Sequence, residues 1–177
     1  MHLIETFSGV TGLKIKSPFI HTDEVSLPSG KYITFHPTHK KGNRRNYKRW
    51  SEVIDGIRSD DYEIVQVGDR GDFFDVYDDY LENTTMNQLA YIIQHSSLHL
   101  GYDSFPVHLS SYFKVPVVAI YNQWSSHSYP YFSDPATYRI IEPDHSVIKP
   151  SFSDNDPFDL INTINPQNII KAVKELL

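Results

Sequence analysis

The side chains best suited to hold a phosphorylated ligand lie in a turn that carries Asp103 and Ser104. A short apolar strand precedes this turn, and a helix over 106–113 is predicted after it, because Pro106 suits the first turn of a helix. A helix N-terminus presents free N–H groups and a partial positive charge, which favour an anion. His108 would lie about one turn into this helix, near that anion. The alternative interpretation is an ordinary turn capped by an Asp–Ser pair, followed by a histidine packed in the core.

A second set of candidates lies in the basic loop 37–46, which follows a predicted strand over 31–36. Basic side chains at such a position can neutralise the charge of a phosphate. The two arginines of the loop are favoured over Lys40 and Lys41 because they lie nearest the start of the next helix. At least two of the four basic residues are expected to be solvated, and the histidine that ends the strand could equally be structural. The candidates in this region are His36, Thr38, Arg44 and Arg45.

These residues must be positioned by a sheet, and the order of elements predicts its class. Strands are predicted over 31–36, 62–67, 98–101, 115–120 and 138–141, with a further short strand near 74–77; helices are predicted over 47–58, 86–95, 106–113 and 166–177. Met1 to Leu13 has weak helical spacing that ends at Gly12. Alternating strands and helices favour an α/β fold with an open, parallel, Rossmann-like sheet and helices on both faces. Right-handed crossovers then bring the loops after residues 36, 67 and 101 to one edge.

Composition limits the classes of function. A chain of 177 residues is expected to form one domain of typical size, here 31–177, preceded by a connecting helix and linker over 1–30. The formal net charge of −6 argues against a nucleic-acid or membrane-surface partner. The absence of cysteine excludes disulfides and thiolate chemistry. We expect a cytoplasmic protein, since neither a signal peptide nor a membrane span is evident.

Motifs for other chemistries are missing. The sequence has no phosphate-binding loop of the G-x-x-x-x-G-K-[ST] type, no G-x-G-x-x-G fingerprint and no G-x-S-x-G elbow. An H-x-x-H spacing occurs at His36 and His39, but no helical histidine pair is accompanied by a carboxylate. We therefore expect no metal cofactor.

Taken in order, several stretches resemble the C-terminal, nucleotide-sugar-binding half of glycosyltransferase family 9, the ADP-heptose–lipopolysaccharide heptosyltransferases of GT-B fold. The stretches are F-H-P-T-H-K-K-G-N-R-R-N-Y-K-R-W, I-V-Q-V-G-D-R-G-D, D-S-F-P-V-H-L-S followed by P-V-V-A-I, and the tail I-N-P-Q-N-I-I-K-A-V-K-E-L-L. Three departures stand out. Phe105 replaces the glycine of the family signature, the region around Asn122 replaces a second glycine, and the acceptor-binding half is missing.

The resemblance implies that a nucleotide diphosphate sugar is the donor and that its sugar passes to an acceptor hydroxyl without a metal. Asp103 and Ser104 would hold hydroxyls and a phosphate oxygen, and His108 would donate to the diphosphate. The arginines of the basic loop would neutralise the leaving diphosphate. Gly68 would let the base or ribose approach the backbone, and Asp72 would accept hydrogen bonds from ribose, although Asp72 could equally be a turn residue.

The catalytic base is expected from another domain, so no catalytic residue is assigned in this chain. The partners expected besides the nucleotide sugar are a separate acceptor-binding domain or further copies in a homo-oligomer. The alternative function is a non-catalytic nucleotide-binding or protein-interaction module on the same fold, which the Phe105 departure makes plausible.

Overall fold

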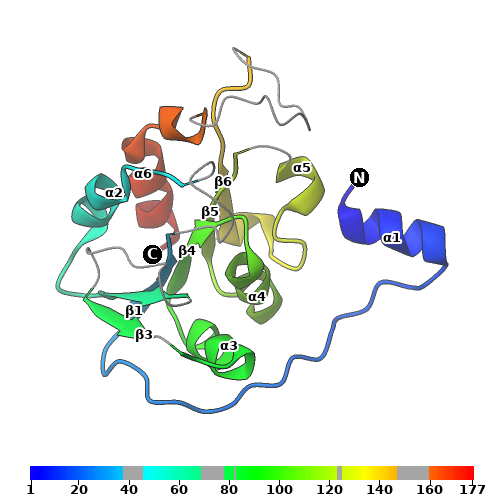
Figure 1. The fold of residues 1–177 in the computed structure, drawn as a ribbon, viewed down its shortest axis with the longest axis horizontal. Helices are drawn as coiled ribbons and strands as arrows, with labels where there is room; N and C mark the ends of the chain where they lie inside the picture. The colour runs from blue at the N-terminus through cyan, green and yellow to red at the C-terminus, as the bar shows by residue number, and fades with distance from the viewer. Residues whose placement is uncertain (38–45, 69–77, 82, 123–124, 147–159) are drawn as a thin grey trace.

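The computed structural model describes residues 1–37, 46–68, 78–81, 83–122, 125–146 and 160–177. Its centre is a six-stranded sheet whose strands all pair in parallel (Figure 1). The strands lie in the order β3-β2-β1-β4-β5-β6. Their bounds are β1 (Tyr32–His36), β2 (Glu63–Val67), β3 (Asp79–Leu81), β4 (Leu98–Tyr102), β5 (Val117–Ile120) and β6 (Tyr138–Ile141). The predicted fold class, an open parallel α/β sheet, is confirmed.

Helices cover both faces of this sheet. Their bounds are α1 (Leu3–Thr11), α2 (Trp50–Ile57), α3 (Met86–Gln94), α4 (Phe105–Phe113), α5 (Ser125–Ser128) and α6 (Pro166–Leu176), with 3-10 turns at Pro135–Thr137 and Leu160–Thr163. Helices α2 and α6 pack on one face, and α3 and α4 pack on the other (Figure 1). None of the described helices has the length and apolar character that a membrane crossing requires.

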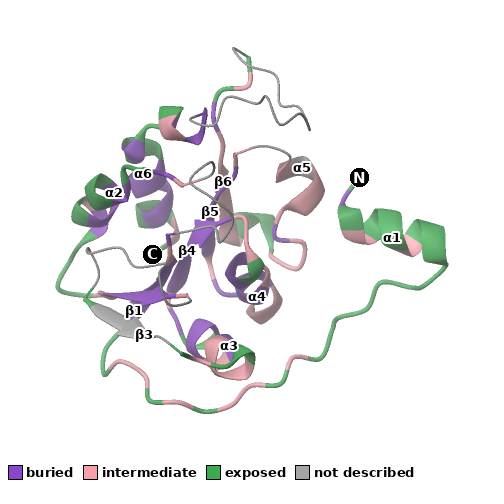
Figure 2. Cartoon of the chain, in the orientation of Figure 1, coloured by how far each residue is buried: buried purple, intermediate pink, exposed green. Residues whose placement is uncertain are grey.

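The alternation of side chains along each strand separates the two cores. In β1, Ile33 and Phe35 join the larger apolar cluster under α2 and α6, whereas Tyr32 packs with Ile92 of α3 on the other face. The central strands are buried along almost their whole length, as parallel strands covered on both faces must be (Figure 2).

The strand order fixes where a ligand can bind. From β1 the chain builds outward through β2 and β3, then returns to the middle and builds the other way from β4. Strands β1 and β4 are therefore neighbours whose following loops run in opposite directions. In open α/β sheets, ligands bind in the crevice that this reversal leaves beyond the carboxyl ends of the strands.

Helix α2 and strand β5 begin two or more residues later than predicted, each for a tertiary reason. Helix α2 begins at Trp50 rather than at Tyr47, because the Tyr47 N–H donates to the Tyr102 hydroxyl and the Lys48 N–H to Asn162 Oδ1. Strand β5 begins at Val117 rather than Val115, because the Val115 N–H bonds to Ser110 O at the end of α4.

Among the other predicted elements, one helix was not expected, one strand cannot be compared and two helices begin where predicted. The short helix α5 occupies part of a stretch that we expected to be loop. The strand expected near 74–77 falls outside the described residues, and β3 follows that stretch. Helices α3 and α6 begin after the predicted caps Thr85 and Asn165, whose side chains accept backbone N–H groups.

Helix α1 lies apart from the sheet, joined to β1 by a long stretch that runs beneath α3 (Figure 1). Its cap is His2, whose Nδ1 accepts from the Ile4 N–H at 3.1 Å. Nε2 therefore carries the hydrogen and donates to Tyr129 O at 3.1 Å. Helix α1 itself, described throughout, buries none of its residues. His2, the residue that precedes the helix, thus ties α1 to the segment at Tyr129.

The contact between α2 and α6 yields a test of packing. A Cβ added to Gly56 would lie 2.4 Å from Cδ1 and 2.9 Å from Cγ1 of Ile170. We expect Gly56→Ala to lower the free energy of unfolding by about 1–3 kcal/mol through overpacking, measured by urea unfolding. A Cβ on Gly9 of α1 meets nothing within 4 Å, so Gly9→Ala is the matched control and should not destabilise.

Combining Gly56→Ala with Ile170→Val, which removes the Cδ1 nearest to the new Cβ, should recover part of the loss. A strictly additive double variant would contradict the proposed steric cause.

Candidate functional site

The candidate site begins with a pair of side chains at the ends of β1 and β4. Nδ1 of His36, the last residue of β1, lies 3.1 Å from the Ser104 hydroxyl oxygen. That hydroxyl donates to Tyr102 O at 3.0 Å, so its oxygen accepts from His36 and Nδ1 carries the hydrogen. The pair joins two residues that are far apart in the chain at the crevice predicted by the strand order.

Gly101 allows the two strands to approach closely beneath this pair. It is the register partner of His36, and a Cβ at Gly101 would lie 3.0 Å from His36 O and 3.0 Å from His99 Nε2. A glycine inside a strand commonly marks such a close backbone approach. A side chain at this position would require the His36 backbone or the His99 ring to shift by a few tenths of an ångström.

A buried histidine forms the floor of the site. His99 is fully buried, and its Nδ1 lies 3.0 Å from the Thr34 hydroxyl. Burial lowers the pKa of His99 to about 3, and the neighbouring His36 adds to the shift. His99 is therefore uncharged at neutral pH, so it adds no positive charge beneath His36.

The start of α4 completes this edge. Ser104 is the N-cap in extended conformation, but its hydroxyl turns to Tyr102 and His36 and makes no cap bond within the described structure. Phe105 takes the first helical position with 47% of its surface exposed. The first turn of α4 thus lacks the side-chain acceptor that usually caps a helix.

An acidic and a basic group flank that turn. Asp103 accepts a weak hydrogen bond of 3.4 Å from the Ser128 hydroxyl, and its Oδ1 lies 4.0 Å from His108 Nε2. Burial lowers the pKa of His108, and the nearby His2 lowers it further. His108 also lines a mostly apolar cavity of about 150 Å³ between α4 and the N-terminal segment, together with Ile4, Pro18, Phe105 and Tyr131.

Both ends of the basic loop are anchored near the same edge. At the start, the Trp50 indole N–H donates to Pro37 O at 2.9 Å. At the end, the Tyr47 N–H donates to the Tyr102 hydroxyl, so residue 47 contacts the last residue of β4.

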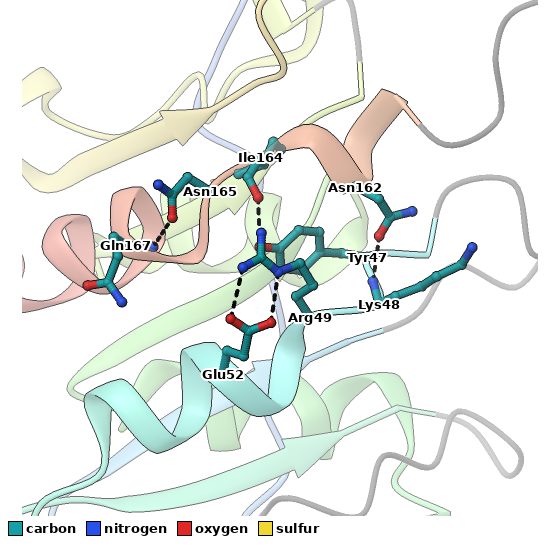
Figure 3. Close-up of polar contacts among 8 residues, drawn as sticks. All are labelled: Tyr47, Lys48, Arg49, Glu52, Asn162, Ile164, Asn165 and Gln167. Carbon is teal, nitrogen blue, oxygen red and sulfur yellow. Dashed lines mark hydrogen bonds and ion pairs between the residues drawn. The ribbon is translucent and has the colours of Figure 1, made fainter.

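The loop's end is also tied to the segment before α6 (Figure 3). The Tyr47 hydroxyl donates to Ile164 O at 2.9 Å, and Asn162 Oδ1 accepts from the Lys48 N–H at 2.7 Å. Burial raises the pKa of Tyr47 to about 12, so this hydroxyl keeps its proton.

The structure places the predicted site residues as follows. His36, Asp103, Ser104 and His108 come together around the ends of β1 and β4. Gly68 follows β2 at the same edge, one strand from β1, with φ 151°, which disfavours any residue with a Cβ. Thr38, Arg44, Arg45 and Asp72 lie outside the described residues.

Sequence reasoning missed the residues that support the site. Thr34, His99 and Gly101 lie inside strands, where only the glycine carried a recognisable signal. Tyr102 and Tyr47 gave no signal, because their contact joins residues 55 positions apart. Among the described residues, no group of three or more His, Asp or Glu side chains is arranged to hold a metal ion.

Comparisons with known proteins complete this description. The family model for glycosyltransferase family 9 (heptosyltransferase) matches residues 8–157. The chain belongs to glycosyltransferase family 9. The resemblance inferred from the sequence is therefore confirmed. No curated protein sequence matches the chain.

Solved structures agree on the fold. An E. coli ADP-heptose lipopolysaccharide heptosyltransferase II superposes with a TM-score of 0.65 at 19% identity, covering 85% of this chain and 48% of that one. A family 9 glycosyltransferase from Veillonella parvula superposes with a TM-score of 0.66 at 17% identity, covering 97% of this chain and 49% of that one. The iron-containing dodecameric glycosyltransferase TibC of enterotoxigenic E. coli superposes with a TM-score of 0.58 at 14% identity, covering 89% of this chain and 47% of that one. The chain thus spans about half the length of these relatives.

The buried histidine makes stability depend on pH. Its pKa is about 3 in the folded protein and about 6.5 when unfolded, so the unfolded state binds the extra proton between these values. His99 therefore stabilises the fold above about pH 6.5 and loses that contribution as pH falls toward 3. Between about pH 7 and pH 5 this group should lower the free energy of unfolding by about 2 kcal/mol.

The measurement is urea unfolding of the wild type and of His99→Gln at both pH values. Glutamine cannot titrate at this position. Between pH 7 and pH 5 the variant should therefore lose about 2 kcal/mol less of its free energy of unfolding than the wild type loses. An equal loss in both proteins would show that His99 does not remain neutral in the fold.

Proposed function

We propose that this chain binds the diphosphate of a nucleotide diphosphate sugar at the edge formed by β1 and β4, as the donor half of a glycosyltransferase. The observation that carries the proposal is the His36–Ser104 pair, which joins the ends of both strands where the order of the sheet reverses. Ligands of open α/β sheets bind at this place.

The start of α4 supplies the electrostatic part of the argument. Its first N–H groups and its dipole favour an anion, and Ser104 leaves this position without a competing side-chain acceptor. The Ser104 hydroxyl, which donates to Tyr102 O in this structure, would turn to donate to a phosphate oxygen while still accepting from His36. Asp103 would accept hydrogen bonds from sugar or ribose hydroxyls. His108, one turn into α4, would donate to the diphosphate.

The basic loop would supply the remaining charge. Arg44 and Arg45 immediately precede Asn46 and Tyr47, and Tyr47 is bonded to the end of β4. Their guanidinium groups would neutralise the diphosphate as it departs, so the proposed transfer needs no metal ion. Gly68 and Asp72, after β2, would approach the ribose and base.

The proposal includes a second component. The family 9 structures that this chain resembles are about twice as long, and the acceptor hydroxyl would be deprotonated by a residue of an acceptor-binding half outside this chain. We propose a cytoplasmic location, with which the absence of cysteine is consistent.

A non-catalytic module remains a second candidate because of Phe105. Its exposed ring stands at the first position of α4, where the family signature has glycine, and it would keep a phosphate farther from the backbone. Such a domain would bind a nucleotide weakly or serve in assembly.

Titration separates the two candidates. We expect calorimetry and thermal unfolding with ADP, UDP, GDP and their sugars to show binding of at least one, with about 2.7 kcal/mol of stabilisation at 100 times its Kd. Ser104→Ala and the double variant Arg44→Ala, Arg45→Ala should each weaken binding about tenfold or more, because each removes a charged or polar phosphate contact.

The control is Arg139→Ala on the outer strand β6, where the arginine pairs with Glu175. Its affinity should match that of the wild type. Absence of binding to every nucleotide, or an equal loss in the control, would refute the proposed site.

Turnover gives an independent result. With donor and acceptor supplied together, the isolated chain should bind the donor but transfer sugar slowly or not at all, since no base is assigned in it. A coupled assay that monitors the release of nucleoside diphosphate measures the rate of sugar transfer. Rapid transfer by the chain alone would show that the base lies within these residues.

A further inference from the structure

The cavity between helix α4 and the N-terminal segment has no part in the proposed function. Its volume is about 150 Å³. Helix α4 forms one wall through Phe105 and Leu109, and Ile4 and Ile20 of the N-terminal segment form a second. The loop at 131–132 forms a third. Three segments that are far apart in the chain therefore meet around this cavity.

Hydrogen bonds hold these walls in place. Ser111 Oγ of α4 accepts from the Phe132 N–H at 2.8 Å, and the Lys114 ammonium group donates to Phe132 O. His2, at the start of α1, is bonded to Tyr129 O at 3.1 Å. A cavity costs stability because its lining loses packing contacts, so walls that are free to move tend to close. These bonds at the margin resist that collapse.

The lining is apolar and rich in aromatic rings. Phe105, Tyr112, Tyr131 and Phe132 all line the cavity. The rings of Tyr131 and Phe132 lie 5.4 Å apart at an angle of 88°. Aromatic side chains favour edge-to-face or offset contact with a further ring. An apolar cavity of about 150 Å³ is the size that takes up one benzene-sized ring.

One imidazole gives this cavity a polar end. His108 lines it and makes no hydrogen bond within the described structure, since Asp103 Oδ1 lies 4.0 Å from its Nε2. Burial lowers the pKa of His108, so the imidazole is neutral at neutral pH and can accept a hydrogen bond. The His108 side chain is 43% exposed and Phe105 is 47% exposed. The cavity therefore borders the protein surface at these two residues.

We propose that this cavity binds a small molecule through a single phenol ring, whose hydroxyl donates to His108 and whose ring packs against the aromatic lining. A ring without the hydroxyl would fill the same volume but leave the imidazole without a partner. Phe105 and His108 also border the proposed nucleotide site. Phenol binding is measured without nucleotide, so it holds or fails independently of the proposed function.

Titration of the full chain with phenol, followed by NMR, tests this site. We expect a Kd of about 1 mM or tighter, because so small a ring makes few contacts. The methyl signals of Ile4, Ile20 and Leu109 should shift as phenol binds. Ile4→Trp places a larger side chain in the cavity and should weaken binding about tenfold or more.

The matched control is Leu3→Trp, a similar enlargement on the same helix. Leu3 is 49% exposed and does not line the cavity, so this variant should bind phenol as the wild type does.

His108→Leu tests the hydroxyl without altering α1. Toluene carries a methyl group in place of the phenol hydroxyl, so the ratio of the two affinities isolates the hydrogen bond. The preference for phenol over toluene should fall about fivefold in this variant.

Three results would each overturn the proposal. The first is no phenol binding at about ten times the expected Kd. The second is binding that Ile4→Trp leaves intact, and the third is a ratio of affinities that His108→Leu leaves unchanged.

Discussion

The close contact of β1 with β4 is the constraint on which the rest of the site depends. These strands are neighbours although β2 and β3 lie between them in the chain, and their register sets His36 opposite Gly101. Because Gly101 has no Cβ, the His36 backbone can lie against it and the imidazole can reach Ser104. The absence of a side chain at Gly101 thus permits the close approach of the two strands at this edge.

At this edge a neutral histidine is buried beneath the surface, and the polar groups suited to an anion lie above it. His99 lies beneath the pair, fully buried and neutral, with its Nδ1 bonded to Thr34. A charged group at that depth would be costly without a partner, and it would also repel a protonated His36. The polar groups suited to an anion are instead at the surface, on His36, Ser104 and the first turn of α4.

The sequence predicted the parts of this structure that follow from local patterns. Apolar strand-like runs that alternate with segments of helical spacing were sufficient to predict the parallel sheet. The capping residues Thr85 and Asn165 mark the starts of α3 and α6. The sequence also predicted that His36, Asp103 and Ser104 would come together, because residues that follow parallel strands meet at one edge. The supporting contacts were not predictable, because Tyr47 with Tyr102 and Thr34 with His99 are pairings set by packing between distant segments. For the same reason the start of α2 was placed too early.

The anchoring of the basic loop has a consequence for how such a domain can diversify. Residues 38–45 are bracketed by the Trp50 bond to Pro37 and the Tyr47 bond to Tyr102, neither of which uses a side chain from the loop. Replacing the loop's sequence would leave both attachments in place, and changing its length alters the cost of closing it only slowly. The same fold can accordingly accept many different loop sequences between these two attachments. Ligand preference can therefore change at this loop while the fold stays the same.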